Sequence, residues 1–151
     1  MAVYLGVKFV LDLEACLYFA SCKKVQKTAL YKKASAERVA TITEVFFQLQ
    51  QINKVFAAEL KKSGIEILDC DEAVYLRTEA LSALLLASSN APLGRVEQDK
   101  LVLIALVSCA QNGQLPKCVL VTGDPGTHRA SMNSLCNALQ MNAIQVDGAF
   151  A

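Results

Sequence analysis

Residues 117–129, KCVLVTGDPGTHR, contain the stretch that decides the fold. Residues 118–121 form an apolar run that is too short for a helix and rich in valine, which predicts a strand buried on both faces of a parallel sheet. The turn-forming residues 122–126, TGDPG, end that strand, and a helical pattern follows. Asp124 therefore lies where a buried strand gives way to a helix, which is the edge at which open α/β sheets bind ligands.

Further strands and helices are predicted on both sides of this stretch. Apolar runs of strand length occur at residues 7–11, 39–42, 65–68 and 143–146. Helical spacing of apolar residues occurs at residues 13–22, 44–62, 71–87, 97–111 and 131–140, and a lysine-rich stretch covers residues 23–33. Thr43 and Asp71 are expected to cap helices. Because strands alternate with helices, we predict an α/β protein, a three-layer α/β/α fold with a central, largely parallel sheet of Rossmann-type topology.

Length and composition predict one globular domain over residues 1–151. The hydrophobic fraction is 54% and the charged fraction 19%, values that argue against disorder. The formal net charge of +1 does not by itself indicate a nucleic-acid or membrane partner. No apolar run reaches the ~18 residues that a membrane helix needs. The start of the chain lacks the pattern of a signal peptide.

The six cysteines and the single histidine, His128, argue against a zinc site or a disulfide framework. No two cysteines have the C-x-x-C spacing, and most stand in apolar runs, where cysteine acts as a small hydrophobic residue. We therefore expect a reducing, cytoplasmic location.

Three aspartates are expected at one edge of the sheet. Asp12 follows the first strand, Asp124 follows the strand at 118–121, and Asp99 opens the helix between them. Hard oxygen ligands of this kind suit Mg²⁺ or Mn²⁺, which can activate water and neutralise charge on a phosphate. Each acid also has an ordinary structural explanation: helix capping for Asp12, the helix dipole for Asp99 and turn formation for Asp124.

The order of these motifs resembles the PIN-domain superfamily. The resemblance rests on VLDLEACLYF (residues 10–19), EQDKLVLIALVSCA (97–110) and VLVTGD (119–124), and it extends to SGIEILDCDEA (63–73) and MNSLCNALQMNAIQV (132–146). It covers almost the whole chain. The related NYN branch shares the V-x-S/T-G-D strand end, so both branches remain open.

This resemblance implies a Mg²⁺- or Mn²⁺-dependent ribonuclease. By the resemblance, Asp12, Asp99 and Asp124 would bind the metal or orient its water molecules, and the hydroxyl of Thr122 would support them. It also implies RNA as substrate. A small chain of this family fits the toxin of a toxin–antitoxin pair, with an inhibitory protein partner.

Two departures from the family pattern leave a non-enzymatic alternative open. The family usually has Asp-x-Asn after the first strand, whereas Leu13 and Glu14 follow Asp12 here. The family's second acid is replaced by Gln48, and Glu44, one turn earlier, is the only nearby carboxylate and a weak metal candidate. The chain could then be a weak nuclease, or a degenerate PIN-like scaffold that binds protein or RNA.

Several other residues have both a functional and an ordinary interpretation. Lys23, Lys24, Lys27 and Arg129 could contact an RNA backbone, or could simply form solvated surface. His128 could act as a general acid or as a substrate contact, or could be an exposed loop residue. The GDPG turn lacks the Lys-Ser/Thr pair of a P-loop, although a nucleotide-binding domain remains an alternative. The high apolar content also predicts a homodimer or another partner over a hydrophobic face.

Overall fold

The computed structural model describes residues 6–87, 98–111, 118–124, 126, 131–139, 141 and 143–150. Within these residues the strands form a five-stranded sheet of order β3-β2-β1-β4-β5. The strands are β1 (Phe9–Leu11), β2 (Val39–Ile42), β3 (Glu66–Leu68), β4 (Val119–Thr122) and β5 (Ala143–Gln145). Every neighbouring pair is parallel. The predicted parallel sheet is therefore confirmed.

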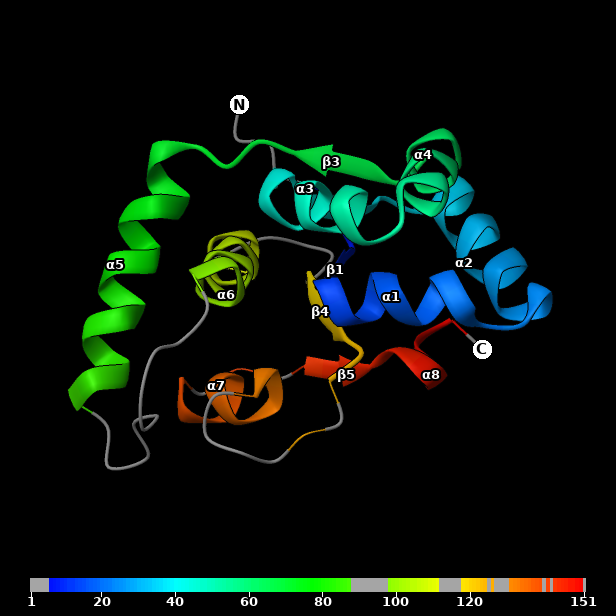
Figure 1. Ribbon diagram of the computed structural model, residues 1–151. Coiled ribbons are helices and arrows are strands. Elements are labelled where there is room, and N and C mark those ends of the chain that lie inside the picture. Colours follow the sequence, from blue (N-terminus) through cyan, green and yellow to red (C-terminus); the bar gives the residue numbers. More distant parts are fainter. Residues whose placement is uncertain are drawn as a thin grey trace.

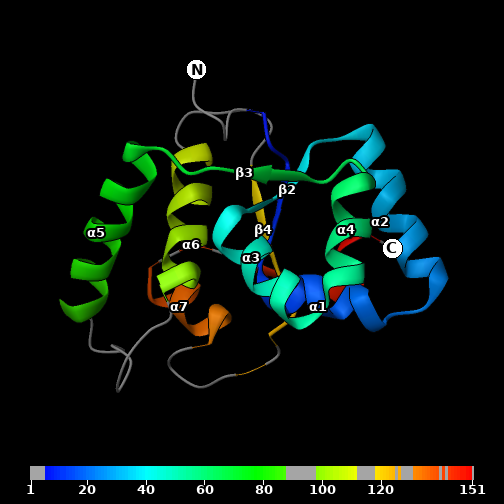
Figure 2. The ribbon, with the colours of Figure 1, turned by 45° about the horizontal axis from the view of Figure 1, so that its top comes forward.

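Helices cover both faces of the sheet (Figure 1). They are α1 (Leu13–Ser21), α2 (Lys24–Ala36), α3 (Thr43–Ile52), α4 (Lys54–Lys62), α5 (Glu72–Ala87), α6 (Gln98–Gln111), α7 (Met132–Ala138) and α8 (Val146–Ala149). Figure 2 shows α5, α6 and α7 on one side of the strands and α1, α2 and α4 on the other. The predicted three-layer α/β/α arrangement is confirmed.

The central strands are apolar because both of their faces are covered. Val10, Leu11, Leu120 and Val121 have no exposed surface, as expected for a parallel sheet between two helical layers. β1 pairs with β2 on one side and with β4 on the other, and the strand order reverses between β1 and β4. The carboxyl ends of β1 and β4 therefore border the position where ligands bind in sheets of this kind.

Four local predictions need correction. The helix predicted at 44–62 is two helices, because Asn53 has a non-helical backbone and its side chain accepts a hydrogen bond from the Phe56 amide at 3.0 Å. Thr43 is the first residue of α3 rather than its cap, and its hydroxyl donates to the Leu68 carbonyl at 3.1 Å. The strand predicted at 7–11 begins only at Phe9, and the last strand ends at Gln145, where α8 follows.

Two expectations about caps and membrane helices can be compared directly with the structure. Asp71 caps α5 as predicted, since its side chain accepts from the Val74 amide at 3.1 Å. Within the ranges given above, no helix is long and apolar enough to cross a membrane. Residues 88–94, SSNAPLG, have the composition of a loop, and residues 112–113, Asn-Gly, that of a helix end. Both segments lie outside the described residues.

Gly123 allows the end of β4 to approach the start of α1. A Cβ atom at this position would lie 2.4 Å from the Glu14 carbonyl oxygen and 2.8 Å from the Ala15 nitrogen. Both neighbours are main-chain atoms, which cannot move aside as a flexible side chain could. The close approach also brings the Gly123 amide within 3.3 Å of the Asp12 carboxylate. Glycine is therefore required here for space.

We predict that Gly123→Ala lowers the free energy of unfolding by about 3 kcal/mol, the upper end of the usual cost of overpacking. Gly64→Ala is the control, because Gly64 has a φ of +96° and no atom within 4 Å of the added Cβ. That change should cost about 1 kcal/mol through backbone strain alone. Urea unfolding of both variants measures the difference, and an equal or smaller loss for Gly123→Ala would contradict the close approach.

Candidate functional site

Asp12 stands at the carboxyl end of β1 and caps α1. Its side chain is 3% exposed. Its Oδ1 atom accepts hydrogen bonds from the Ala15 amide at 2.7 Å and from the Gly123 amide at 3.3 Å. The first of these bonds is that of an N-cap, which satisfies an amide at the start of the helix. The second ties the carboxylate to the segment that follows β4.

Thr122, the last residue of β4, connects the two aspartates at this edge. Its buried hydroxyl donates a hydrogen bond to Oδ2 of Asp12 and accepts one from the Asp124 amide at 3.1 Å. Both carboxylate oxygens of Asp12 are thereby hydrogen-bonded. A hydroxyl is required at this position, because one atom must donate to a carboxylate and accept from an amide.

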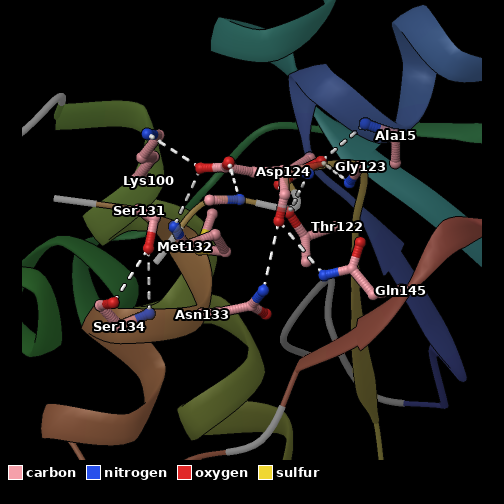
Figure 3. A network of polar contacts seen from close by, with 12 residues as sticks. Ala15, Lys100, Thr122, Gly123, Asp124, Ser131, Met132, Asn133, Ser134 and Gln145 are labelled. Atoms are coloured by element: carbon pink, nitrogen blue, oxygen red, sulfur yellow. Dashed lines mark hydrogen bonds and ion pairs between the residues drawn. The ribbon is translucent and has the colours of Figure 1, made fainter. Parts of the chain in front are cut away.

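Asp124 links the end of β4 to three other segments (Figure 3). Its Oδ1 accepts from the Gly126 amide at 2.8 Å, and its Oδ2 accepts from the Met132 amide at 3.3 Å. The Lys100 ammonium lies 3.8 Å from Oδ2. The side chains of both members of this ion pair are 15% exposed. Asp124 therefore has a nearby basic partner.

Two amide side chains fix the main chain at Asp124. Asn133 from α7 and Gln145 from β5 each donate to the Asp124 carbonyl oxygen at 3.2 Å (Figure 3). Together with the Lys100 ion pair, these contacts attach α6, α7 and β5 to the residue that follows β4. We name the set formed by Asp12, Thr122 and Asp124 the switch-point cluster, after its position between β1 and β4.

Asp12 and Asp124 differ in electrostatic environment. Burial raises the pKa of the Asp12 carboxyl above its ordinary value, and the nearby charge of Glu14 adds to this shift. The hydrogen bonds from Thr122, Ala15 and Gly123 oppose it. The groups that act on the pKa of Asp12 are thus neutral donors and one further acid. A cation placed beside Asp12 would therefore relieve an unfavourable charge.

Asp99 lies in the first turn of α6, directly before Lys100. Since Lys100 reaches Asp124, the start of α6 faces the switch-point cluster. The described residues nevertheless contain no group of three or more His, Cys, Asp or Glu side chains placed to hold a metal ion. The cluster as placed thus brings together Asp12, Thr122 and Asp124, while Asp99 remains a candidate by its position on α6.

The weaker candidate, Glu44, makes its contact elsewhere. It lies in the first turn of α3, and its Oε2 accepts a hydrogen bond from the Tyr75 hydroxyl of α5 at 3.3 Å. Gln48 donates to the Glu44 carbonyl oxygen at 3.4 Å. The described contacts of Glu44 therefore lead to α5 rather than to Asp12.

The remaining candidates from the sequence are the cysteines, His128 and Arg129. The six cysteines, all among the described residues, form no disulfide with one another, and Cys16, Cys118 and Cys136 are buried, consistent with the prediction of small hydrophobic residues. His128 and Arg129 lie outside the described residues. Sequence reasoning missed Lys100, Asn133 and Gln145. Of these, Gln145 had a usable signal, since it lies near the carboxyl end of the strand predicted at 143–146 and so belongs at the same edge as Asp12 and Asp124.

The donor set fits a divalent cation by its chemistry. Mg²⁺ and Mn²⁺ prefer oxygen ligands, and the cluster offers carboxylate oxygens at a sheet edge. Asp12 supplies a buried carboxylate, and no basic group contributes to the shift of its pKa. Against this, Asp124 already has the Lys100 ammonium at 3.8 Å. The acids present could therefore hold a metal ion if the Lys100 ammonium stayed beside that ion or moved away from Asp124.

The fold and the cluster define an α/β protein with a polar site at the switch point of a parallel sheet. No protein-family model matches the chain, and no curated protein matches it. Among solved structures, the chain is similar to one in the crystal structure of VapBC2 from Rickettsia felis bound to a DNA fragment from their promoter. The TM-score is 0.60 with 17% sequence identity, covering 92% of this chain and 97% of that chain. This likeness shows a shared fold.

We predict that Asp12→Asn gains stability relative to the wild type as the pH rises in metal-free buffer containing EDTA. Asp12 has a folded-state pKa above its ordinary value of 3.8, so folded protein holds this proton more tightly than unfolded protein. The contribution of Asp12 to wild-type stability should therefore fall between about pH 3.8 and the raised pKa, and this loss should be absent from the variant. Urea unfolding across that range measures the difference. A difference that shrinks with rising pH would show a lowered pKa instead.

Proposed function

We propose that this chain is a PIN-like, metal-dependent ribonuclease whose active site is the switch-point cluster. The observation that carries the proposal is the hydrogen-bonded chain from Asp12 through Thr122 to Asp124. These three residues match the first acid and the T-x-D motif of the family that the sequence resembles. They also lie at the carboxyl ends of β1 and β4, the edge where ligands bind in such sheets.

Asp12, Asp124 and Asp99 are the residues proposed to hold Mg²⁺ or Mn²⁺. When bound, such an ion would supply Lewis acidity and a more acidic water molecule for attack on a phosphodiester. The protein's own contribution is to fix the acids. The amides of Ala15 and Gly123 hold Oδ1 of Asp12, and Thr122 holds Oδ2. Little reorganisation would then be needed when substrate arrives.

Lys100 is proposed to contact the scissile phosphate. Its ammonium lies 3.8 Å from Asp124 and is mostly buried, with 15% of the side chain exposed. A phosphate bound beside Asp124 would bring a second anionic partner to this ammonium, and such contacts position a nucleic-acid backbone without reading its sequence. The proposal thus gives Lys100 the role of a substrate-binding residue.

The toxin–antitoxin setting is part of the same proposal. The sequence resemblance implies it, and the shared fold with a chain of the VapBC2 structure supports it. In that setting RNA would be the substrate, and an inhibitory protein would be the partner. A cytoplasmic location and a homodimer accompany the proposal as expectations from the sequence.

We predict that Asp124→Asn and Asp12→Asn each lower Mn²⁺-dependent cleavage of single-stranded RNA by about 100-fold or more, since each removes a charge from the proposed metal site. The measurement is a gel assay of end-labelled RNA with and without EDTA. Asp147→Asn is the matched control, because Asp147 is exposed in α8. Equal cleavage by the wild type and Asp124→Asn would refute the role of Asp124.

A catalytically degenerate scaffold is the second candidate, and three observations favour it. Lys100 already lies beside one of the acids, Gln48 stands where the family has a further acid, and no three-acid group is found among the described residues. In this case the switch-point cluster would serve mainly to join β1, β4, α6 and α7, and the protein would act through its surface.

Calorimetric titration with Mn²⁺ separates the two candidates. For the nuclease, we predict a saturable heat of binding in the wild type that weakens at least about tenfold in Asp12→Asn. Lys100→Met should strengthen Mn²⁺ binding, because the substitution removes the ammonium that competes for Asp124. If the wild type and Lys100→Met both show only heats of dilution, the scaffold is the correct interpretation.

A further inference from the structure

A pocket lies between α1, α2 and α8, outside the switch-point cluster. Its volume is about 190 Å³. The residues that line it include Tyr18 and Phe19 of α1, Gln26 of α2, Val146 of α8 and Phe150, which follows α8. Figure 1 shows α8 beside the end of α1, where the chain turns into α2. We name this feature the α1–α2–α8 pocket.

Three aromatic rings stand in the wall of the pocket. The rings of Tyr18 and Phe19 meet edge to face with their centres 5.4 Å apart, and the centres of Phe19 and Phe150 are 5.9 Å apart. Phe150 also meets Phe9 of β1, with ring centres 5.1 Å apart. Phe19 is 2% exposed and Val146 is 5% exposed, so the inner wall belongs to the core. This wall offers an apolar, aromatic surface to another ring.

The Gln26 side chain holds the polar part of the wall in place. Its Nε2 donates a hydrogen bond to the Tyr18 hydroxyl at 2.6 Å, and its Oε1 accepts one from the Lys23 amide at 3.1 Å. Because both polar ends of the Gln26 side chain are bonded, Gln26 and Tyr18 are already fixed before a ligand arrives. A wall that is fixed in advance lowers the cost of binding.

Asp147 gives the pocket its charge. Among the described residues that line the pocket, it alone carries a charged side chain. It is exposed in the first turn of α8, and within the described ranges its carboxylate has no ion-pair partner. A carboxylate beside aromatic rings favours a cation, because the faces of the rings attract positive charge as well.

We propose that the α1–α2–α8 pocket binds a small aromatic amine, a single ring that carries an ammonium group on a short alkyl arm. The ring would pack against Phe19 and Phe150, and the ammonium would face the Asp147 carboxylate. An apolar cavity of about 150 Å³ can hold benzene. The pocket volume of about 190 Å³ therefore suits one ring and a short arm.

The pocket is separate from the proposed nuclease site. Asp12 and Tyr18 are about 9 Å apart along the axis of α1, and no residue of the switch-point cluster lines the pocket. The proposal goes beyond the nuclease and does not depend on it. Asp12 and Asp124 are carboxylates too, so the experiment must show where the amine binds.

An aromatic acid fits the pocket less well. Lys23 and Lys24 lie at the start of α2 and would attract an acid, but neither lines the pocket. The carboxylate of such a ligand would have to lie beside Asp147, and two like charges repel each other. The sign of the ligand's charge is therefore a sharp test of the proposal.

The test titrates ¹⁵N-labelled protein with phenethylamine, which carries an ammonium group at pH 7, and follows the amide signals by NMR. Neutral 2-phenylethanol and anionic 3-phenylpropionate are matched probes with the same ring. We predict saturable shifts of the Phe19 and Val146 amides. Phenethylamine should bind at least about fivefold more tightly than 2-phenylethanol, because it gains the carboxylate and the ring faces together. 3-Phenylpropionate should bind most weakly of the three.

Asp147→Asn and Glu72→Gln form a matched pair of charge removals. Both acids are exposed in the first turn of a helix, but Asp147 lines the pocket and Glu72 does not. Asp147→Asn should weaken the binding of phenethylamine about threefold, as expected for an exposed ion pair. The same variant should leave the binding of 2-phenylethanol unchanged. Glu72→Gln should change neither.

Ala29→Leu tests the pocket itself. Ala29 is a partly exposed lining residue of α2, and leucine is a good helix former that would place its side chain in the space proposed for the ring. This variant should weaken the binding of phenethylamine and of 2-phenylethanol at least about tenfold. Ala80→Leu, at an exposed position of α5, is the control. If urea unfolding shows that Ala29→Leu is destabilised, the exposed Asp147→Asn decides.

Three outcomes would overturn the proposal. Shifts confined to the amides of Gly123 and Asp124 would place the amine at the switch-point cluster. Equal binding of phenethylamine and 3-phenylpropionate, or equal effects of Asp147→Asn and Glu72→Gln, would remove Asp147 from the interaction. An absence of saturable shifts up to about 10 mM phenethylamine would show that the pocket does not bind this class of ligand.

Discussion

The hydrogen bond from the Thr122 hydroxyl to the Asp12 carboxylate is the constraint around which the rest of this structure is arranged. It joins residues 110 positions apart in the sequence and ties the ends of β1 and β4 together. Asp12 also starts α1, and Asp124 connects to α6, α7 and β5. Asp12, Thr122 and Asp124 together therefore fix where four segments, α1, α6, α7 and β5, meet the sheet edge.

Burying Asp12 has an electrostatic cost that the fold only partly offsets. Three hydrogen bonds stabilise the carboxylate, yet burial still raises its pKa. An apolar residue at this position would leave the amides of Ala15 and Gly123 without this acceptor, and unsatisfied buried amides are costly. The structural role of accepting these hydrogen bonds thus explains in part why position 12 is an aspartate. The unrelieved charge is what makes a bound cation physically reasonable at this edge.

Acidic and basic side chains lie on different parts of the molecule. The acids of the switch-point cluster lie at the carboxyl ends of the central strands, whereas seven lysines belong to α2 and α4. Because the formal net charge of the whole chain is only +1, this separation is invisible in the composition. A nearly neutral chain can therefore combine an acidic cluster with a basic region elsewhere on its surface.

The sequence by itself determined the alternation of strands and helices, the parallel sheet and the placement of Asp12 and Asp124 at one edge, because these follow from local patterns and from the rules of parallel sheets. It missed the break at Asn53, where a side-chain cap overrides a continuous helical pattern. Only the tertiary structure decided that Lys100 pairs with Asp124 and that Glu44 pairs with Tyr75. It also decided that Tyr31 of α2 donates a hydrogen bond to Glu59 of α4. These contacts depend on which distant side chains meet, and periodicity along a chain carries no information about that.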